Sequence, residues 1–280
     1  MRILITGAAG MLGHDVIQAA ASHEVVALSR AELDITDERA VNAAVERVLP
    51  DVVVNCAAWT DVDGAESALD DALAVNGVGA GVVAAAASGA GAWTVHVSSD
   101  YVFDGSKRSP YVESDPVGPV SAYGHSKLAG EEAVAAAAPD SHTIVRSSWL
   151  FGVAGSCFPK TILKLAAERP VLRVVDDQVG CPTYTGHLAG ALLDLAERRV
   201  PGVVHVAGGG SCSWFEFARA IVSVSGLTSA VEPCSTDEFP RPAPRPAYSV
   251  LRSELGDRVP ALPPWQEGLS EFMASGVVTA

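Results

Sequence analysis

Several features that mark other classes of protein are scarce in this sequence of 280 residues. Its five cysteines are scattered, odd in number and never spaced C-x-x-C, so neither a disulfide framework nor a zinc site is indicated. Lys and Arg total 19 against 33 Asp and Glu, and the formal charge of −14 argues against a nucleic-acid partner. The longest apolar runs fall short of the ~20 residues that a membrane span needs, and the start shows no signal-peptide pattern. We therefore expect a soluble, cytoplasmic protein with no membrane or nucleic-acid partner.

The first motif is a glycine turn between a strand and a helix. The apolar run Arg2 to Thr6 precedes G-x-x-G-x-x-G at Gly7, Gly10 and Gly13, and an Ala-rich helical segment follows. In such a turn the first glycine permits the tight bend, the second lets backbone approach a pyrophosphate, and the third lets helix pack on strand. A glycine turn without a ligand is the alternative, but the strand-turn-helix context favours a dinucleotide site.

The end of the next strand bears on the choice of cofactor. The strand Glu24 to Leu28 is followed by Ser29 and Arg30, where an acidic residue would hold the ribose diol of NAD. A hydroxyl and a guanidinium suit a 2′-phosphate instead, which predicts NADPH as the preferred cofactor with NADH still used. The alternative for Arg30 is a solvated surface arginine.

A hydroxyl, a phenol and an amine follow in the stretch 96–127. Thr94 to Ser98 is predicted to be a buried strand, which places Ser99 at the carboxyl edge of the sheet, where open parallel sheets bind ligands. Tyr123 and Lys127 open a helix, and their i, i+4 spacing puts both side chains on one face. The ammonium would then stabilise the phenolate left by proton donation, while Ser99 polarises the same carbonyl. A common surface pair is the alternative.

Strands and helices alternate regularly to Ser147, which predicts an α/β fold with a doubly wound parallel sheet. Beyond Phe151 the alternation loosens, and the stretch 240–246 (PRPAPRP) must be a loop. We therefore expect a dinucleotide-binding Rossmann domain at 1–150, with a return of about 176–200 to it. Residues 151–280 would form mainly a smaller C-terminal α/β domain that binds substrate.

Longer motifs carry a resemblance over nearly the whole chain. They are ITGAAGMLG, LDITD, PDVVVNCAAWTDVDGAE, VSSDYVFDG, SAYGHSKLAGE, VRSSWLFG, VVDDQVGCPTY, VHVAGGG and RPAYSVL. With them the sequence resembles the extended short-chain dehydrogenases/reductases, and more closely the dTDP-4-dehydrorhamnose reductase family of deoxysugar biosynthesis.

The resemblance implies that a nicotinamide hydride reduces the C4 keto group of a dTDP-sugar, with Ser99, Tyr123 and Lys127 as the catalytic triad. It also implies that Tyr123 and Lys127 contact the cofactor. The further cofactor contacts implied are Gly7, Gly10, Met11, Leu12, Asp34, Ile35, Ala57, Ala58 and Thr60. The substrate contacts implied are Ser99, Val102, Trp149 and Arg245.

Two departures from the family pattern leave questions open. Gly155, Ser156 and Cys157 replace an asparagine-rich loop, which leaves the accepted sugar undefined. Some relatives hold magnesium at a dimer interface with glutamates, whereas only Asp15 lies near such a place, so no metal is predicted and a homodimer stays open. A non-catalytic dinucleotide-binding regulatory subunit and a nucleotide-sugar epimerase or dehydratase remain the alternative functions.

Overall fold

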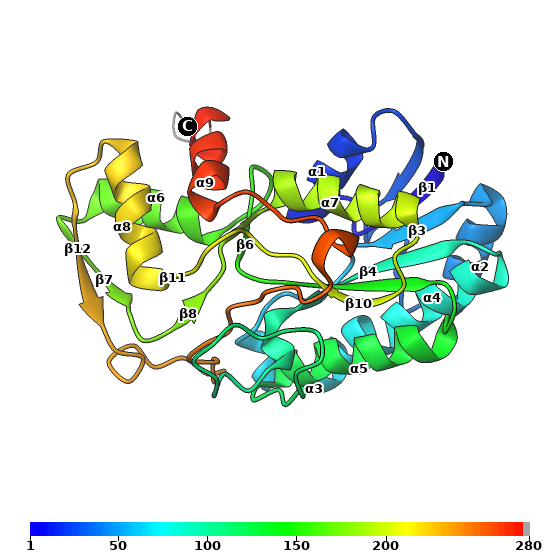
Figure 1. The fold of residues 1–280 in the computed structure, drawn as a ribbon, viewed down its shortest axis with the longest axis horizontal. Coiled ribbons are helices and arrows are strands. Elements are labelled where there is room, and N and C mark those ends of the chain that lie inside the picture. Colours follow the sequence, from blue (N-terminus) through cyan, green and yellow to red (C-terminus); the bar gives the residue numbers. More distant parts are fainter. Residues whose placement is uncertain (277–280) are drawn as a thin grey trace.

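The computed structural model describes residues 1–276 and is built around one six-stranded parallel sheet (Figure 1). The strand order is β10-β5-β4-β3-β1-β2. The strands are β1 (Arg2–Thr6), β2 (Glu24–Leu28), β3 (Val52–Asn55), β4 (Trp93–Ser99), β5 (His142–Ser147) and β10 (Gly202–His205). The order reverses between β1 and β3, and such a switch point is where open α/β sheets bind their ligands. The predicted doubly wound α/β fold is confirmed.

Helices cover both faces of this sheet because its strands bury alternate side chains on opposite sides. Ile3 and Ile5 of β1 pack with α1 (Met11–Ala19) and α7 (Thr185–Arg198), whereas Leu4 packs with α2 (Glu38–Val48) on the other face. That second face is completed by α4 (Ala80–Gly89) and α5 (Ala122–Ala137).

The long helical segment between β3 and β4 is interrupted by a π turn. It consists of α3 (Leu69–Leu73), the π turn η2 (Ala74–Gly79) and α4. By length and composition alone, Leu69–Gly89 could cross a membrane. The sequence analysis did not identify this segment, because it considered only uninterrupted apolar runs. Here it packs against α2, α5 and the sheet, as the core helix of a globular fold does.

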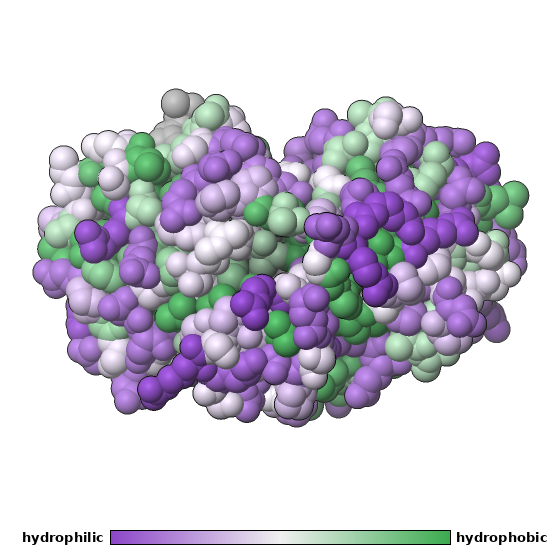
Figure 2. Space-filling model, in the orientation of Figure 1, coloured by the Kyte–Doolittle hydropathy of each residue, from purple (hydrophilic) through white to green (hydrophobic). Residues whose placement is uncertain are grey.

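A smaller lobe lies beside the sheet and has its own apolar core (Figure 1). Its helices are α6 (Phe158–Glu168), α8 (Trp214–Ser225) and α9 (Trp265–Ala274), and β7 (Val171–Val175) pairs in parallel with β12 (Ala230–Cys234). Phe151, Phe217 and Phe272 meet in its centre. Figure 2 shows a notch between the two lobes at the top of the view.

The chain crosses between the lobes more than once. Short strands make the crossings: β6 (Leu150–Phe151) pairs with β9 (Thr183–Tyr184), and β8 (Val179–Gly180) pairs with β11 (Cys212–Ser213). Between the crossings, α7 and β10 join the large sheet layer. The segment that returns to this layer therefore spans 185–205, slightly later than the expected 176–200.

Candidate active site

The glycine turn forms the floor of a pocket at the switch point between β1 and β3. Gly7 has φ +68°, and a Cβ added there would lie 2.6 Å from the Ala57 backbone nitrogen. A Cβ on Gly13 would lie 2.4 Å from the Gly7 carbonyl oxygen, so the start of α1 packs directly on the turn. Both positions need glycine for these reasons. The pocket of about 320 Å³ is lined by Gly7, Ala9, Gly10, Arg30, Leu33, Asp34, Ile35, Cys56, Ala57, Ala58, Trp59 and Val75.

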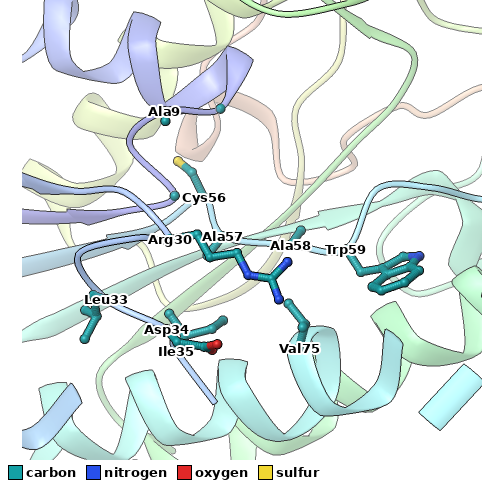
Figure 3. A pocket seen from close by; sticks show the side chains of 12 residues that line it. Ala9, Arg30, Leu33, Asp34, Ile35, Cys56, Ala57, Ala58, Trp59 and Val75 are labelled. Atoms are coloured by element: carbon teal, nitrogen blue, oxygen red, sulfur yellow. The ribbon is translucent and has the colours of Figure 1, made fainter. Parts of the chain in front are cut away.

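Arg30 lies where the sequence placed it, but Ser29 does not act with it. The Arg30 guanidinium reaches across the pocket towards Ala58 and Val75 (Figure 3). The turn after β2 folds back, so that Ser29 donates its hydroxyl hydrogen to the Glu32 carboxylate at 2.7 Å, and its N–H donates to the same oxygen at 2.8 Å. Glu32 thus brings an acidic group next to Ser29, which the order of residues after the strand did not indicate.

Seven residues of the predicted cofactor set line this pocket: Gly7, Gly10, Arg30, Asp34, Ile35, Ala57 and Ala58. Met11, Leu12, Gly13, Ser29 and Thr60 do not line it, nor do Tyr123 and Lys127. Leu12 is buried in the core between the sheet and α7. The sequence interpretation missed the apolar wall of Leu33, Trp59 and Val75.

A further residue missed from the sequence is Asn76, in the π turn. Its Oδ1 accepts from the Trp59 N–H at 2.8 Å, and its Nδ2 donates to the Trp59 carbonyl at 3.1 Å and to Ser126 Oγ at 2.9 Å. Ser126 in turn donates to the Tyr123 carbonyl at 2.7 Å. Asn76 therefore ties the pocket wall to the helix of the predicted catalytic pair, and π turns are frequent at functional sites.

The three predicted catalytic residues come together at the carboxyl edge of β4. Ser99 ends the strand, its Oγ donates to Asp100 at 3.0 Å, and it lies within hydrogen-bonding reach of the Tyr123 phenol. Lys127 is 2% exposed, and its Nζ donates to the Val97 carbonyl at 2.8 Å. Tyr123 also packs edge-on against Tyr101, with ring centroids 5.4 Å apart.

The pKa values at this edge differ from the sequence expectation. Burial, reinforced by the Asp100 carboxylate, raises the pKa of Tyr123 to about 12, while a Ser99 hydrogen bond opposes the rise. Burial lowers the pKa of Lys127 to about 8, against the attraction of Glu131. The expected lowering of the Tyr123 pKa by Lys127 is thus absent here, because the ammonium is engaged by the Val97 carbonyl and desolvation of the phenol dominates.

A buried ion pair lies one helical turn beyond Lys127. Arg146 of β5 donates to the Glu131 carboxylate through Nε at 2.9 Å and Nη2 at 2.6 Å, and the Ser98 hydroxyl donates to the same carboxylate. Both side chains are about 5% exposed (Arg146 6%, Glu131 5%). The pair holds α5 against the ends of β4 and β5, and so fixes the helix that carries Tyr123 and Lys127.

A second pocket, of about 290 Å³, opens from the smaller lobe. Aromatic side chains form part of its wall and three arginines contribute positive charge: Phe158, Trp214, Phe239, Arg173, Arg241 and Arg245. Trp149 stacks on Trp214 with ring centroids 3.5 Å apart and planes 5° apart. Its backbone has φ +47°, an uncommon value for a non-glycine residue.

Of the predicted substrate residues, Arg245 lines this second pocket and Trp149 stacks against its wall. Val102 differs, because its side chain is fully buried with Phe103 and Tyr111 and its carbonyl accepts from the Gly118 N–H. The whole Val102 residue is 0% exposed, so in this arrangement it presents no surface to a ligand. Within residues 1–276, no group of three or more His, Cys, Asp or Glu side chains is arranged to hold a metal.

The residues of the first pocket fit a dinucleotide. The glycine backbone and the start of α1 offer N–H groups to a pyrophosphate, the apolar wall suits an adenine, and Arg30 adds a cation. A dinucleotide site beside a Ser, Tyr and Lys at the edge of a parallel sheet defines an oxidoreductase of the extended short-chain dehydrogenase/reductase class. The chain belongs to the family described as RmlD substrate binding domain, which it matches over residues 1–277.

Individual relatives agree with this membership. The chain is 46% identical to a dTDP-4-dehydrorhamnose reductase of Mycolicibacterium smegmatis, over 99% of this chain and 86% of the relative. It is 43% identical to a dTDP-4-keto-6-deoxy-D-glucose reductase of Streptomyces niveus, over 89% and 88%. The crystal structure of dTDP-4-dehydrorhamnose reductase from Bacillus anthracis in complex with NADP superposes with a TM-score of 0.94 at 38% identity, covering 98% of this chain and 99% of that one.

Proposed function

We propose that this protein reduces the C4 keto group of a dTDP-linked 4-dehydro-6-deoxysugar with NADPH, in deoxysugar biosynthesis. One observation carries the proposal: Ser99, Tyr123 and Lys127 lie together at the sheet edge, beside a dinucleotide pocket and near an arginine-rich aromatic pocket. The relatives named dTDP-4-dehydrorhamnose reductase and dTDP-4-keto-6-deoxy-D-glucose reductase support this substrate class, and the Bacillus anthracis reductase in complex with NADP supports the cofactor. The intact triad separates this proposal from a regulatory subunit without catalysis.

Each residue of the triad has a defined task in the proposed reaction. NADPH, when bound, would supply the hydride that C4 receives. Tyr123 donates its phenolic proton to the C4 oxygen, so that the ketone becomes an alcohol. With substrate bound, the Ser99 hydroxyl would turn from Asp100 to donate to the same oxygen. The Lys127 ammonium would turn from the Val97 carbonyl to stabilise the phenolate and hold the nicotinamide ribose.

We further propose that the two lobes divide the binding. Residues 1–150 with the returning segment 185–205 hold the cofactor, and the remainder of 151–280 binds the dTDP-sugar. The arginines of the second pocket suit a diphosphate, and its aromatic wall suits a pyrimidine base. A homodimer remains the proposed assembly, which light scattering on the purified protein would test.

The deciding experiment is an assay with the purified protein, NADPH and dTDP-4-dehydro-6-deoxy-L-mannose, followed by cofactor absorbance. Consumption of NADPH with formation of one alcohol product supports the proposal. A cofactor that stays bound through gel filtration, with isomerised sugar and no net oxidation, would indicate an epimerase instead. No turnover, together with a stoichiometric protein partner on purification, would indicate the regulatory subunit.

A further inference from the structure

The loop 239–246 of the smaller lobe is fastened to the large lobe by one carboxylate. Figure 1 shows this segment in orange, leaving β12 and running back towards the sheet. Asp63, in the loop after β3, accepts at Oδ2 from Arg241 Nε at 2.9 Å and from Arg241 Nη2 at 2.5 Å. At Oδ1 it accepts from the Ala243 N–H at 3.1 Å and from Arg245 Nη1 at 3.0 Å.

Two of the three side chains in this contact are sheltered from solvent, whereas that of Arg241 is 49% exposed. The side chains of Asp63 and Arg245 are 19% and 16% exposed, which distinguishes them from an ordinary surface pair. Partial burial opposes ionisation of Asp63, but hydrogen bonds from Arg245, the Ala243 N–H and Arg241 outweigh it and hold the pKa of the carboxyl well below its usual value. The carboxylate therefore stays charged at neutral pH.

Asp63 engages only part of each guanidinium. Within residues 1–276, Nη1 of Arg241 and both Nε and Nη2 of Arg245 make no hydrogen bond. Both side chains line the aromatic pocket, whose third arginine, Arg173, is paired with the Glu238 carboxylate at 2.6 Å. Two guanidiniums against one carboxylate leave a net positive charge, and their free N–H groups suit the oxygens of a diphosphate.

The same contact lies close to the reacting residues. Arg245 is near enough to Tyr101 to lower the pKa of its phenol, although burial raises that pKa overall. Tyr101 packs edge-on against Tyr123. A diphosphate held by Arg245 would therefore be only a few side chains from the proposed proton donor.

We propose that Asp63 is a positioning residue that orients Arg241 and Arg245 to bind the diphosphate of the nucleotide-sugar substrate. This rests on the proposed function for the identity of the substrate. Holding the arginines before the ligand arrives removes the cost of ordering two long side chains on binding. Asp63 itself does not touch the reacting atoms.

The test compares dTDP with thymidine, which lacks the diphosphate, by calorimetry on the wild type, Asp63→Asn and a control. We expect Asp63→Asn to weaken dTDP binding about tenfold, the size of one charge-assisted contact, and to leave thymidine unchanged. KM for the ketosugar should rise by a similar factor, with kcat and NADPH affinity within about twofold. The control is Asp194→Asn, which breaks an exposed pair with Arg198 on α7 and should change none of these values.

Several results would overturn the positioning role. They are unchanged dTDP binding, equal losses for dTDP and thymidine, or tighter dTDP binding, which would make Asp63 a competitor of the phosphate. Wild type that binds no dTDP overturns it too. If the wild type reduces the ketosugar and Asp63→Asn behaves identically, only the positioning role fails. If dTDP binding responds as expected but no ketosugar is reduced, the proposed reaction fails and the positioning role stands.

Discussion

Replacing Arg30 with alanine tests the choice of cofactor at a single side chain. The Arg30 guanidinium crosses the dinucleotide pocket. Because the Ser29 hydroxyl already donates to Glu32, Arg30 is the group at this strand end that we expect to bind the 2′-phosphate. A hydrogen bond to a charged group contributes about 1.5–3 kcal/mol, or roughly 10- to 100-fold in affinity. Because Arg30 is exposed, the lower end applies. We expect kcat/KM for NADPH to fall about tenfold in Arg30→Ala, and that for NADH to change less than about twofold.

The assay is the ratio of kcat/KM for NADPH and NADH with one ketosugar, in wild type, Arg30→Ala and Arg39→Ala. Arg39 is an exposed arginine in the first turn of α2 and serves as the matched control. Glu32→Gln removes a carboxylate beside the expected 2′-phosphate and should raise the preference for NADPH. A wild-type ratio near one, or a ratio that Arg30→Ala leaves unchanged, would show that Arg30 is only a surface arginine.

Three further predictions concern the catalytic edge. Tyr123→Phe should lower kcat by roughly 10²-fold or more with cofactor affinity retained, and near-normal turnover would place the acid elsewhere. Turnover should fall as pH rises through about 8, because the Lys127 ammonium that stabilises the phenolate is present below its lowered pKa and is lost above it. A rate that stays level to pH 10 would contradict this role of Lys127. Glu131→Gln should lower the free energy of unfolding by about 3–5 kcal/mol in urea denaturation, because Arg146 is left buried without its counter-ion. The control Asp194→Asn, which breaks an exposed pair, should lower it by less than about 1 kcal/mol. Equal losses in the two variants would refute the argument.

The large lobe was predictable because its signals are local. Apolar runs such as 52–54 of β3 are buried along their whole length, and helices such as α2 start at a capping residue, Asp37. The smaller lobe was harder to predict. In β12 only Cys234 is buried and Pro233 lies inside the strand, so neither alternation nor an apolar run marks it. Helix α9 carried a usable signal, since Trp265, Leu269 and Phe272 have helical spacing.

The candidate site also combines features that are set by local sequence with features that depend on contacts between distant segments. The glycine turn and the Tyr123–Lys127 spacing are fixed within a few residues, so the sequence alone located them. Contacts between distant segments left no such pattern: Asp63 meets Arg245 across 182 positions, and Glu32 reaches Ser29 only through the fold of its turn. The pKa of Tyr123 depends on burial, which a spacing rule cannot supply.

The Asn76 contacts have a consequence for motion. The Asn76 side-chain amide accepts from the Trp59 N–H and donates to the Trp59 carbonyl. Both backbone groups of Trp59 are therefore hydrogen-bonded, as they would be in a sheet, although the segment is irregular. The same amide donates a hydrogen bond to Ser126 on α5. Asn76 therefore links the wall of the cofactor pocket to the helix that carries Tyr123 and Lys127, and we expect these two parts to move together. We therefore expect the Trp59 amide to exchange with deuterium as slowly as those of β3, while adjustments that admit a sugar occur in the smaller lobe. Rapid exchange at Trp59 would show instead that its hydrogen bonds to Asn76 break frequently.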